Sequence, residues 1–113
     1  MRQPRYRRGD VALALVPFAD ATGSKLRPVV VVSSDAFHAV QPANVLVARI
    51  SGNVLAHQTL QDWQVAGLKR ASVVTSFLFT LAPTEIHAML GHLTDRDLRG
   101  VEKCLHLTLD LQR

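Results

Sequence analysis

Basic and hydroxyl side chains gather at three places where a loop meets a predicted strand. These residues are Ser24, Lys25 and Arg27 at the first junction, Arg49 and Ser51 at the second, and Lys69 and Arg70 at the third. A guanidinium can form two parallel hydrogen bonds with phosphate oxygens and stabilise the charge that they gain in a transition state. A hydroxyl can bond a ribose 2′-hydroxyl or a phosphate oxygen. Together these groups suit an RNA phosphodiester, provided that the fold brings the three junctions into one groove.

Each of these residues also has a simpler explanation. Arg27 could form a surface salt bridge with Asp20 or Asp35. Ser51 could be an ordinary turn residue, and the pair at 69–70 could belong to a solvated turn. The sequence leaves both readings open at every position.

Two aromatic residues lie close to the junctions in the sequence, Phe18 and Trp63. An unpaired base that stacks on such a ring contributes roughly 1–3 kcal/mol to binding. The alternative is that both rings belong to the hydrophobic core.

The element that must position the first junction is a strand that starts at Pro28. Four consecutive valines, 29–32, favour a strand because branching at Cβ restricts χ1 and packs well on a pleated surface. The run has no polar alternation, so we expect both faces of this strand to be covered. Proline suits the first residue of a strand, where its missing N–H breaks no ladder bond.

The rest of the chain reads as further strands and two C-terminal helices. Strands are predicted at 11–16, 28–34, 45–51 and 71–81, with a short edge strand at 59–65, one helical turn at 35–39 and a helix at 83–90. The last helix starts at Thr94 as N-cap, with Asp97 completing a capping box. Its apolar stripe is formed by Leu98, Val101, Leu105 and Leu109.

This order of elements predicts an α+β fold that is mostly β: a small, strongly curved, mostly antiparallel sheet with two C-terminal helices. A length of 113 residues fits a single domain spanning 1–113. Residues 1–8 form a basic arm that we expect to be loosely ordered.

Composition points to a cytoplasmic protein with a polyanionic partner. The single cysteine, Cys104, allows no intramolecular disulfide, and the apolar stretch 11–16 is too short for a signal peptide or a membrane span. The net charge is +4, and it is uneven: residues 1–70 hold nine Lys/Arg and four acids, whereas residues 71–113 hold four and five. The basic first part suggests a polyanion, although a solvated surface would look the same.

Metal and cofactor sites are not predicted. The histidines and the cysteine lack the spacing of metal ligands, since His87 and His92 are five residues apart. The chain has no glycine-rich phosphate loop, and no serine stands in a nucleophile elbow.

The residues at the three junctions, taken with their neighbours, resemble the MazF/PemK family of toxin endoribonucleases. The resemblance is carried by the segments 9–11, 16–20 and 23–33 with its Lys-x-Arg-Pro block, by Val45–Ser51, by 62–63, 66–69 and 72–74, and by 90–98 followed by Val101. The first and last of these segments are the most specific.

The resemblance implies a homodimer with an SH3-like barrel core that cuts single-stranded mRNA without a metal ion. It also implies a 2′,3′-cyclic phosphate and a 5′-hydroxyl as products, and a cognate antitoxin that inhibits the enzyme. The catalytic arginine of the family falls on Arg27 and its catalytic threonine on Ser51. The remaining residues expected to contact RNA are Phe18, Ser24, Lys25, Arg49, His57, Lys69 and Arg70.

Arginine has a pKa above about 12 and is therefore a poor general base. The expected role of Arg27 is charge stabilisation, and the proton acceptor is left open between His57 and His38.

The chain departs from the family pattern at two places. Arg49 stands where the family often has proline, which adds a further phosphate contact. The stretch 75–80 is uncharged and one residue shorter than in the family, so a catalytic or base-reading role is not expected for this strand.

Two other functions are compatible with the same fold. CcdB-like proteins poison DNA gyrase through a tryptophan near the C-terminus, whereas this chain ends in Leu109-Asp110-Leu111-Gln112-Arg113. A non-catalytic RNA- or protein-binding relic is the other alternative, and the uncharged stretch 75–80 favours it.

Overall fold

The computed structural model describes residues 6–17, 23–52 and 58–111. In this part of the chain, six strands form one antiparallel sheet in the order β4-β5-β3-β2-β1-β6. The elements are β1 (Asp10–Pro17), β2 (Ser24–Val31), α1 (Asp35–Val40), β3 (Val45–Ser51), β4 (Gln58–Thr59), β5 (Val73–Leu81), the 3-10 turn η1 (Pro83–Glu85), β6 (Ile86–His92) and α2 (Asp95–Leu109).

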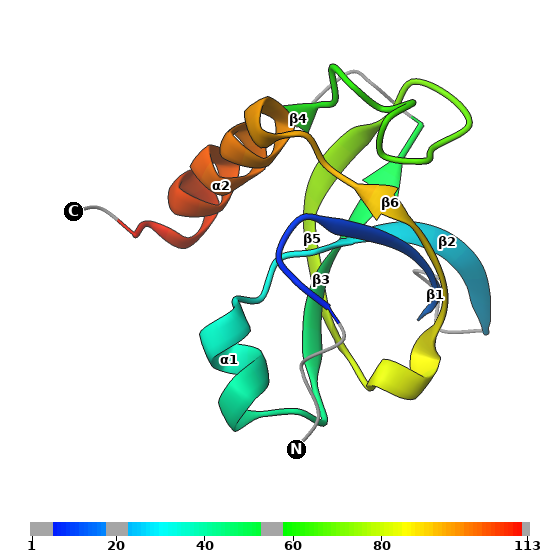
Figure 1. The fold of residues 1–113 in the computed structure, drawn as a ribbon, viewed down its shortest axis with the longest axis vertical. Coiled ribbons are helices and arrows are strands. Elements are labelled where there is room, and N and C mark those ends of the chain that lie inside the picture. The colour runs from blue at the N-terminus through cyan, green and yellow to red at the C-terminus, as the bar shows by residue number, and fades with distance from the viewer. Residues whose placement is uncertain (1–5, 18–22, 53–57, 112–113) are drawn as a thin grey trace.

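The sheet is strongly curved, as predicted, and both helices lie on the same side of it in Figure 1. β4 and β6 are its two edges, so among the described residues the curl does not close into a hydrogen-bonded barrel.

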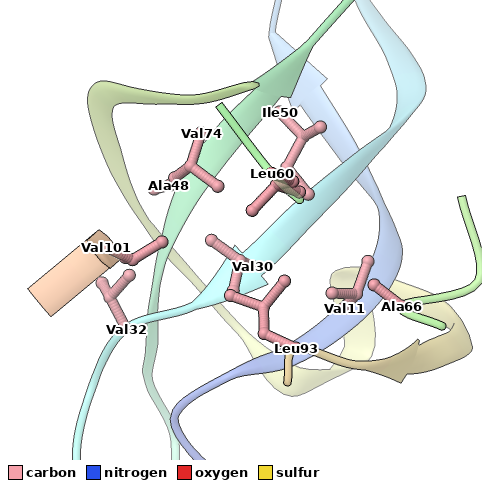
Figure 2. Packing of buried hydrophobic residues seen from close by; sticks show 10 residues of the cluster. All are labelled: Val11, Val30, Val32, Ala48, Ile50, Leu60, Ala66, Val74, Leu93 and Val101. Atoms are coloured by element: carbon pink, nitrogen blue, oxygen red, sulfur yellow. The ribbon is translucent and has the colours of Figure 1, made fainter. Parts of the chain in front are cut away.

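The valine run of β2 is covered on both faces, as predicted. Val29, Val30 and Val31 are all fully buried. Val30 belongs to the cluster that Figure 2 shows, which consists of Val11, Val30, Val32, Ala48, Ile50, Leu60, Ala66, Val74, Leu93 and Val101. Val29 and Val31 point to the opposite face, into a second cluster with Ala12, Ala14, Val16, Val45, Val47 and Leu81. Burying a valine side chain fully contributes about 1.5–3 kcal/mol to the free energy of folding. The buried part of β2 is therefore a stable support for the residues that precede it.

Residues 83–90 do not form the predicted helix. A single 3-10 turn is followed by β6, which pairs with β1 along Val11↔Gly91 and Leu13↔Ala88. Without β6, β1 would be an edge strand with unpaired backbone N–H and C=O groups. The hydrogen bonds gained by pairing the two strands outweigh the weak local helix propensity of residues 83–90. The described chain therefore has one C-terminal helix, α2, instead of two.

Other boundaries differ by a few residues. β2 begins at Ser24, four residues before Pro28, and ends at Val31, so that Ser34 is free to cap α1 by accepting from Phe37 N at 3.1 Å. The expected edge strand at 59–65 is reduced to β4, because Asp62 starts a turn in which its carbonyl accepts from Ala66 N at 3.2 Å.

The predicted capping box of α2 is wrong, although Thr94 is the N-cap residue. The Thr94 hydroxyl donates to Asp62 Oδ2 at 2.6 Å instead. Asp97 is buried and accepts the backbone N–H groups of Gln61 and Asp62 at 2.9 and 2.8 Å. These side chains tie the turn before β5 to the start of α2 instead of capping the helix.

The apolar stripe of α2 faces the sheet over most of its length. Val101 is buried in the first cluster, and Leu98 and Leu105 pack against it. Leu109 remains 49% exposed, so the last turn projects beyond the core.

Candidate functional site

Arg27 and Ser51 lie on the same face of the sheet. In the ladder between β2 and β3, Val29 pairs with Arg49 and Val31 with Val47. Side chains two residues apart on a strand share a face. Continuing the register by two residues therefore places Arg27 of β2 across from Ser51 of β3.

The neighbouring strand β1 supplies small and apolar partners on this face. Arg27 pairs with Ala14, and Lys25 pairs with Val16. Arg27 is half-buried, whereas Ser24 and Lys25 are exposed. A small side chain such as Ala14 leaves room beside the guanidinium stem, which stays packed while its charged end remains accessible.

Within the described part of the chain, Arg27 forms no ion pair; the salt bridges there join Arg8 to Glu102, His92 to Asp10 and Arg96 to Asp62. Asp35 begins α1 after the far end of β2, which removes it as the salt-bridge partner considered above. Asp20 lies outside the described residues.

The third junction also reaches this end of the sheet. The Arg70 side chain lies over the backbone of Gly52, where a Cβ atom would come within 3.2 Å of Nε. The hydroxyl of Ser72 donates to the Arg70 carbonyl at 2.8 Å and fixes the bend before β5. Arg70 thus lies against Gly52, the residue after Ser51, while Lys69 is exposed on the same bend.

Gly67 helps to place this bend against β6. Its φ of 84° lies in the left-handed region, and a Cβ there would overlap the Leu90 carbonyl oxygen. The close approach of these two backbones holds the segment between β4 and β5 against the sheet.

Not every residue in the sequence-based prediction falls in this region. Phe18 and His57 lie outside the described residues. Trp63 packs against the first hydrophobic cluster, on the face opposite Arg27, so it is a core residue and not a stacking surface.

His38 is excluded as the proton acceptor by its position. It is buried in α1, where Nε2 lies 2.6 Å from Ser33 Oγ. α1 follows the end of β2 that is opposite to Arg27, and the extended chain spans about 20 Å over the six residue steps from Arg27 to Ser33.

The sequence-based prediction missed Phe77, which lies under the guanidinium of Arg49. The Arg49 Cζ atom is 5.0 Å from the centre of the Phe77 ring, and the ring side chain is exposed. The partners of Ala48 and Ile50 on β5 are Leu78 and Val74, so three residues of β5 bulge opposite one residue of β3. In the sequence, the two polar residues Thr75 and Ser76 interrupt a hydrophobic strand, and this interruption could have indicated the bulge.

Several acidic groups are engaged in contacts away from this face. Arg96 forms two hydrogen bonds with Asp62, both at 2.8 Å, and together with Thr94 it lowers the pKa of Asp62 to about 2. Asp10 pairs with His92 at 2.7 Å, and Glu102 lies 3.4 Å from Arg8. The charged residues of β2 and β3 on this face, Lys25, Arg27 and Arg49, are all basic.

A separate cavity of about 430 Å³ opens between the two helices. Its lining is mostly apolar and includes Leu46, Leu78 and Leu105, with Arg8 and Glu102 at its polar part. Among the described residues, none of those predicted to contact RNA lines it.

The described residues contain no cluster of three or more histidine, cysteine or acidic side chains that could hold a metal ion. No helix among them is long and apolar enough to cross a membrane.

Comparison with known proteins identifies the family. Residues 7–109 match the family model of the PemK-like, MazF-like toxins of type II toxin–antitoxin systems. The chain belongs to this family. No curated protein matches the sequence.

Solved structures of MazF proteins share the fold. An endoribonuclease in complex with its cognate antitoxin from a mycobacterial species has a TM-score of 0.69 at 21% identity, covering 100% of this chain and 99% of the other. The Mycobacterium tuberculosis toxin MazF-mt6 has a TM-score of 0.69 at 20% identity, covering 90% and 99%. A MazE–MazF crystal structure from Deinococcus radiodurans has a TM-score of 0.71 at 16% identity, covering 95% and 97%.

Proposed function

We propose that this protein is an mRNA interferase: a toxin that cleaves single-stranded RNA by attack of the 2′-hydroxyl on the adjacent phosphate. The observation that supports this most directly is the shared face of Arg27, Arg49 and Ser51, with Arg70 at the same end of the sheet. Membership of the toxin family supports it independently.

The chemistry follows from the groups on this face. The 2′-oxygen loses its proton and forms a bond to phosphorus while the bond to the 5′-oxygen breaks. The leaving 5′-oxygen takes up a proton from water, so the products are a 2′,3′-cyclic phosphate and a 5′-hydroxyl. Arg27 donates hydrogen bonds to the non-bridging oxygens as their charge grows. Ser51 orients the 2′-hydroxyl or a phosphate oxygen. His57 stays the candidate for accepting the 2′-proton.

The basic groups around Arg27 are also expected to bind the partners of the proposed toxin. Lys25 and Lys69 extend the positive charge along the path of an RNA strand, and the Ser24 hydroxyl adds a group that can form hydrogen bonds. An acidic antitoxin segment that folds on binding would compete with RNA for these cations. We propose that the protein acts as a cytoplasmic homodimer that is held inactive by such an antitoxin.

The proposal is tested by substitutions at the two catalytic positions. Arg27→Ala should lower the rate of RNA cleavage by about 100-fold or more, because a preorganised donor to the transition state is lost. Ser51→Ala should also lose activity, whereas Ser51→Thr should keep it because the hydroxyl remains. The readout is cleavage of a long single-stranded RNA, with thermal unfolding of each variant measured in parallel.

Arg99→Ala is the matched control, since Arg99 is exposed on α2. It should cleave RNA like the unmodified protein. Full activity in Arg27→Ala would rule the catalytic assignment out.

One observation favours a second candidate. β5 carries no charged side chain from Val73 to Leu81, so it lacks groups for acid–base work. A non-catalytic member of the family would bind RNA without releasing products, and the same assay combined with a gel shift separates the two functions.

A further inference from the structure

Phe77 presents an aromatic ring to solvent on a strand whose other aromatic ring is packed. It is 56% exposed, whereas Phe79, two residues along β5, packs against the second hydrophobic cluster. Both side chains point to the face that carries Arg27. An exposed phenylalanine gains little from core packing.

The backbone around Phe77 is fixed to β3. The Thr75 hydroxyl donates to the Arg49 carbonyl at 2.9 Å and accepts the backbone N–H of Phe77 at 3.2 Å. Thr75 is buried, so these two bonds are shielded from water. The bulge of β5 is thereby held in one conformation, next to β3 as Figure 1 shows.

The guanidinium of Arg49 covers one face of the ring. Its Cζ atom lies 5.0 Å from the ring centre, which is within the range of a cation–π contact. Because that face is covered, the exposed area of the ring must come mainly from its opposite face and its edge. A flat, apolar surface of fixed orientation therefore remains open.

We propose that Phe77 is a stacking platform for an unpaired base of the bound RNA, with Arg49 supporting the ring from behind. This inference rests on the proposed function, and it adds a base-contacting residue to it. Arg49 precedes Ser51 by two residues on β3, a span of about 7 Å. A nucleotide whose phosphate contacts Arg27 would place a neighbouring base within reach of the ring.

Charge favours RNA over a protein as the occupant. Lys25, Arg27, Arg49 and Arg70 all lie at this end of the sheet, and a phosphate chain neutralises them while its bases cover the ring. Stacking on an aromatic ring tolerates any base, so Phe77 would contribute affinity at one position without reading the base edge.

The test is a binding cycle with two uncleavable probes. Both are fluorescein-labelled, 2′-O-methylated single strands of about ten nucleotides, one of mixed sequence and one with every base removed. Affinities are measured by fluorescence anisotropy for the unmodified protein, Phe77→Leu and Phe77→Trp. Val40→Ala, at an exposed apolar position at the end of α1, is the control.

Phe77→Leu should weaken binding of the base-containing probe about 10-fold and of the abasic probe less than about twofold, because only the first can stack. Phe77→Trp should bind the base-containing probe as tightly as the unmodified protein does. Equal losses on both probes, or no loss on the base-containing probe, would overturn the inference. Equal losses together with a lower molecular mass in light scattering would assign the ring to a contact between two copies of the chain.

Failure of the proposed function gives a different pattern. If the unmodified protein bound neither probe, both the proposed function and the platform would be wrong. If it bound the probes but cut no RNA, the catalytic assignment would fail while the comparison between probes would still decide the role of Phe77.

Discussion

The proposed role of Arg27 depends on the shape of its side chain as well as on its charge. A guanidinium offers a planar fork of donors that matches two phosphate oxygens, whereas a lysine ammonium is a point charge on a flexible stem. Arg27 is half-buried at the start of a strand whose next residues are fully buried. That setting places the base of the side chain on a rigid strand.

Arg27→Lys should consequently bind RNA nearly as well as the unmodified protein but cleave it about 10- to 100-fold more slowly. Anisotropy with the uncleavable probe and single-turnover cleavage give the two values separately. If Arg27→Lys lost affinity and cleavage rate by the same factor, Arg27 would contribute to RNA binding alone.

At the level of elements, a clamp connects the turn before β5 to the start of α2. Asp97 accepts two backbone N–H groups of that turn, and Asp62 accepts hydrogen bonds from the Thr94 hydroxyl and from Nε and Nη2 of Arg96. The bend that carries Lys69 and Arg70 follows directly. The clamp therefore helps to place the third basic junction beside Ser51.

The clamp predicts a particular dependence of stability on pH. The pKa of Asp62 is lowered from 3.8 to about 2 by its bonds to Arg96 and Thr94. A carboxyl with a lowered pKa in the folded state stabilises the protein above its unfolded pKa, and this contribution is lost as the pH falls toward the folded pKa. Asp62→Asn should therefore be less stable than the unmodified protein at pH 5–7, and the difference should shrink between about pH 4 and pH 2.

Urea unfolding at a series of pH values measures this difference. Asp95→Asn, at an exposed carboxyl in the first turn of α2, controls for the loss of one negative charge. A deficit of Asp62→Asn that stayed constant across the series would contradict the role of its ionised form.

Elements with strong local signals were predictable from the sequence. The β-branched stretches at Val45–Ser51 and in β1 gave strands at the expected places, and the valine run of β2 is covered on both faces. The helix predicted at 83–90 was wrong because the stretch pairs with β1, a partner more than seventy residues away. Local propensity carries no information about such pairing.

The same limit applies to the candidate site. Basic residues at strand ends could be recognised from their type and position, and the structure places Arg27, Arg49, Ser51 and Arg70 at one end of the sheet. The contact of Phe77 with Arg49 depends on a bulge whose register is set by the partner strand. A sequence pattern alone could not give it. The catalytic and binding roles of these residues stay predictions.

For the whole molecule, the distribution of charge should control RNA affinity. Each phosphate neutralised on a single strand contributes about 0.7 to the slope of log K against log salt concentration. Arg70→Ala should reduce that slope by about 0.7, whereas Arg99→Ala on α2 should leave it unchanged. Titrations of the uncleavable probe at several salt concentrations test this, and an equal effect of both variants would show that only net charge matters.

The most direct test of the central claim is to incubate the purified protein with a long single-stranded RNA in excess EDTA and to map the product ends. The proposed mechanism predicts cuts at one short motif, with a 5′-hydroxyl on one fragment and a 2′,3′-cyclic phosphate on the other, and no cuts with Arg27→Ala. RNA that stays intact, or cuts that persist unchanged in Arg27→Ala, would contradict it.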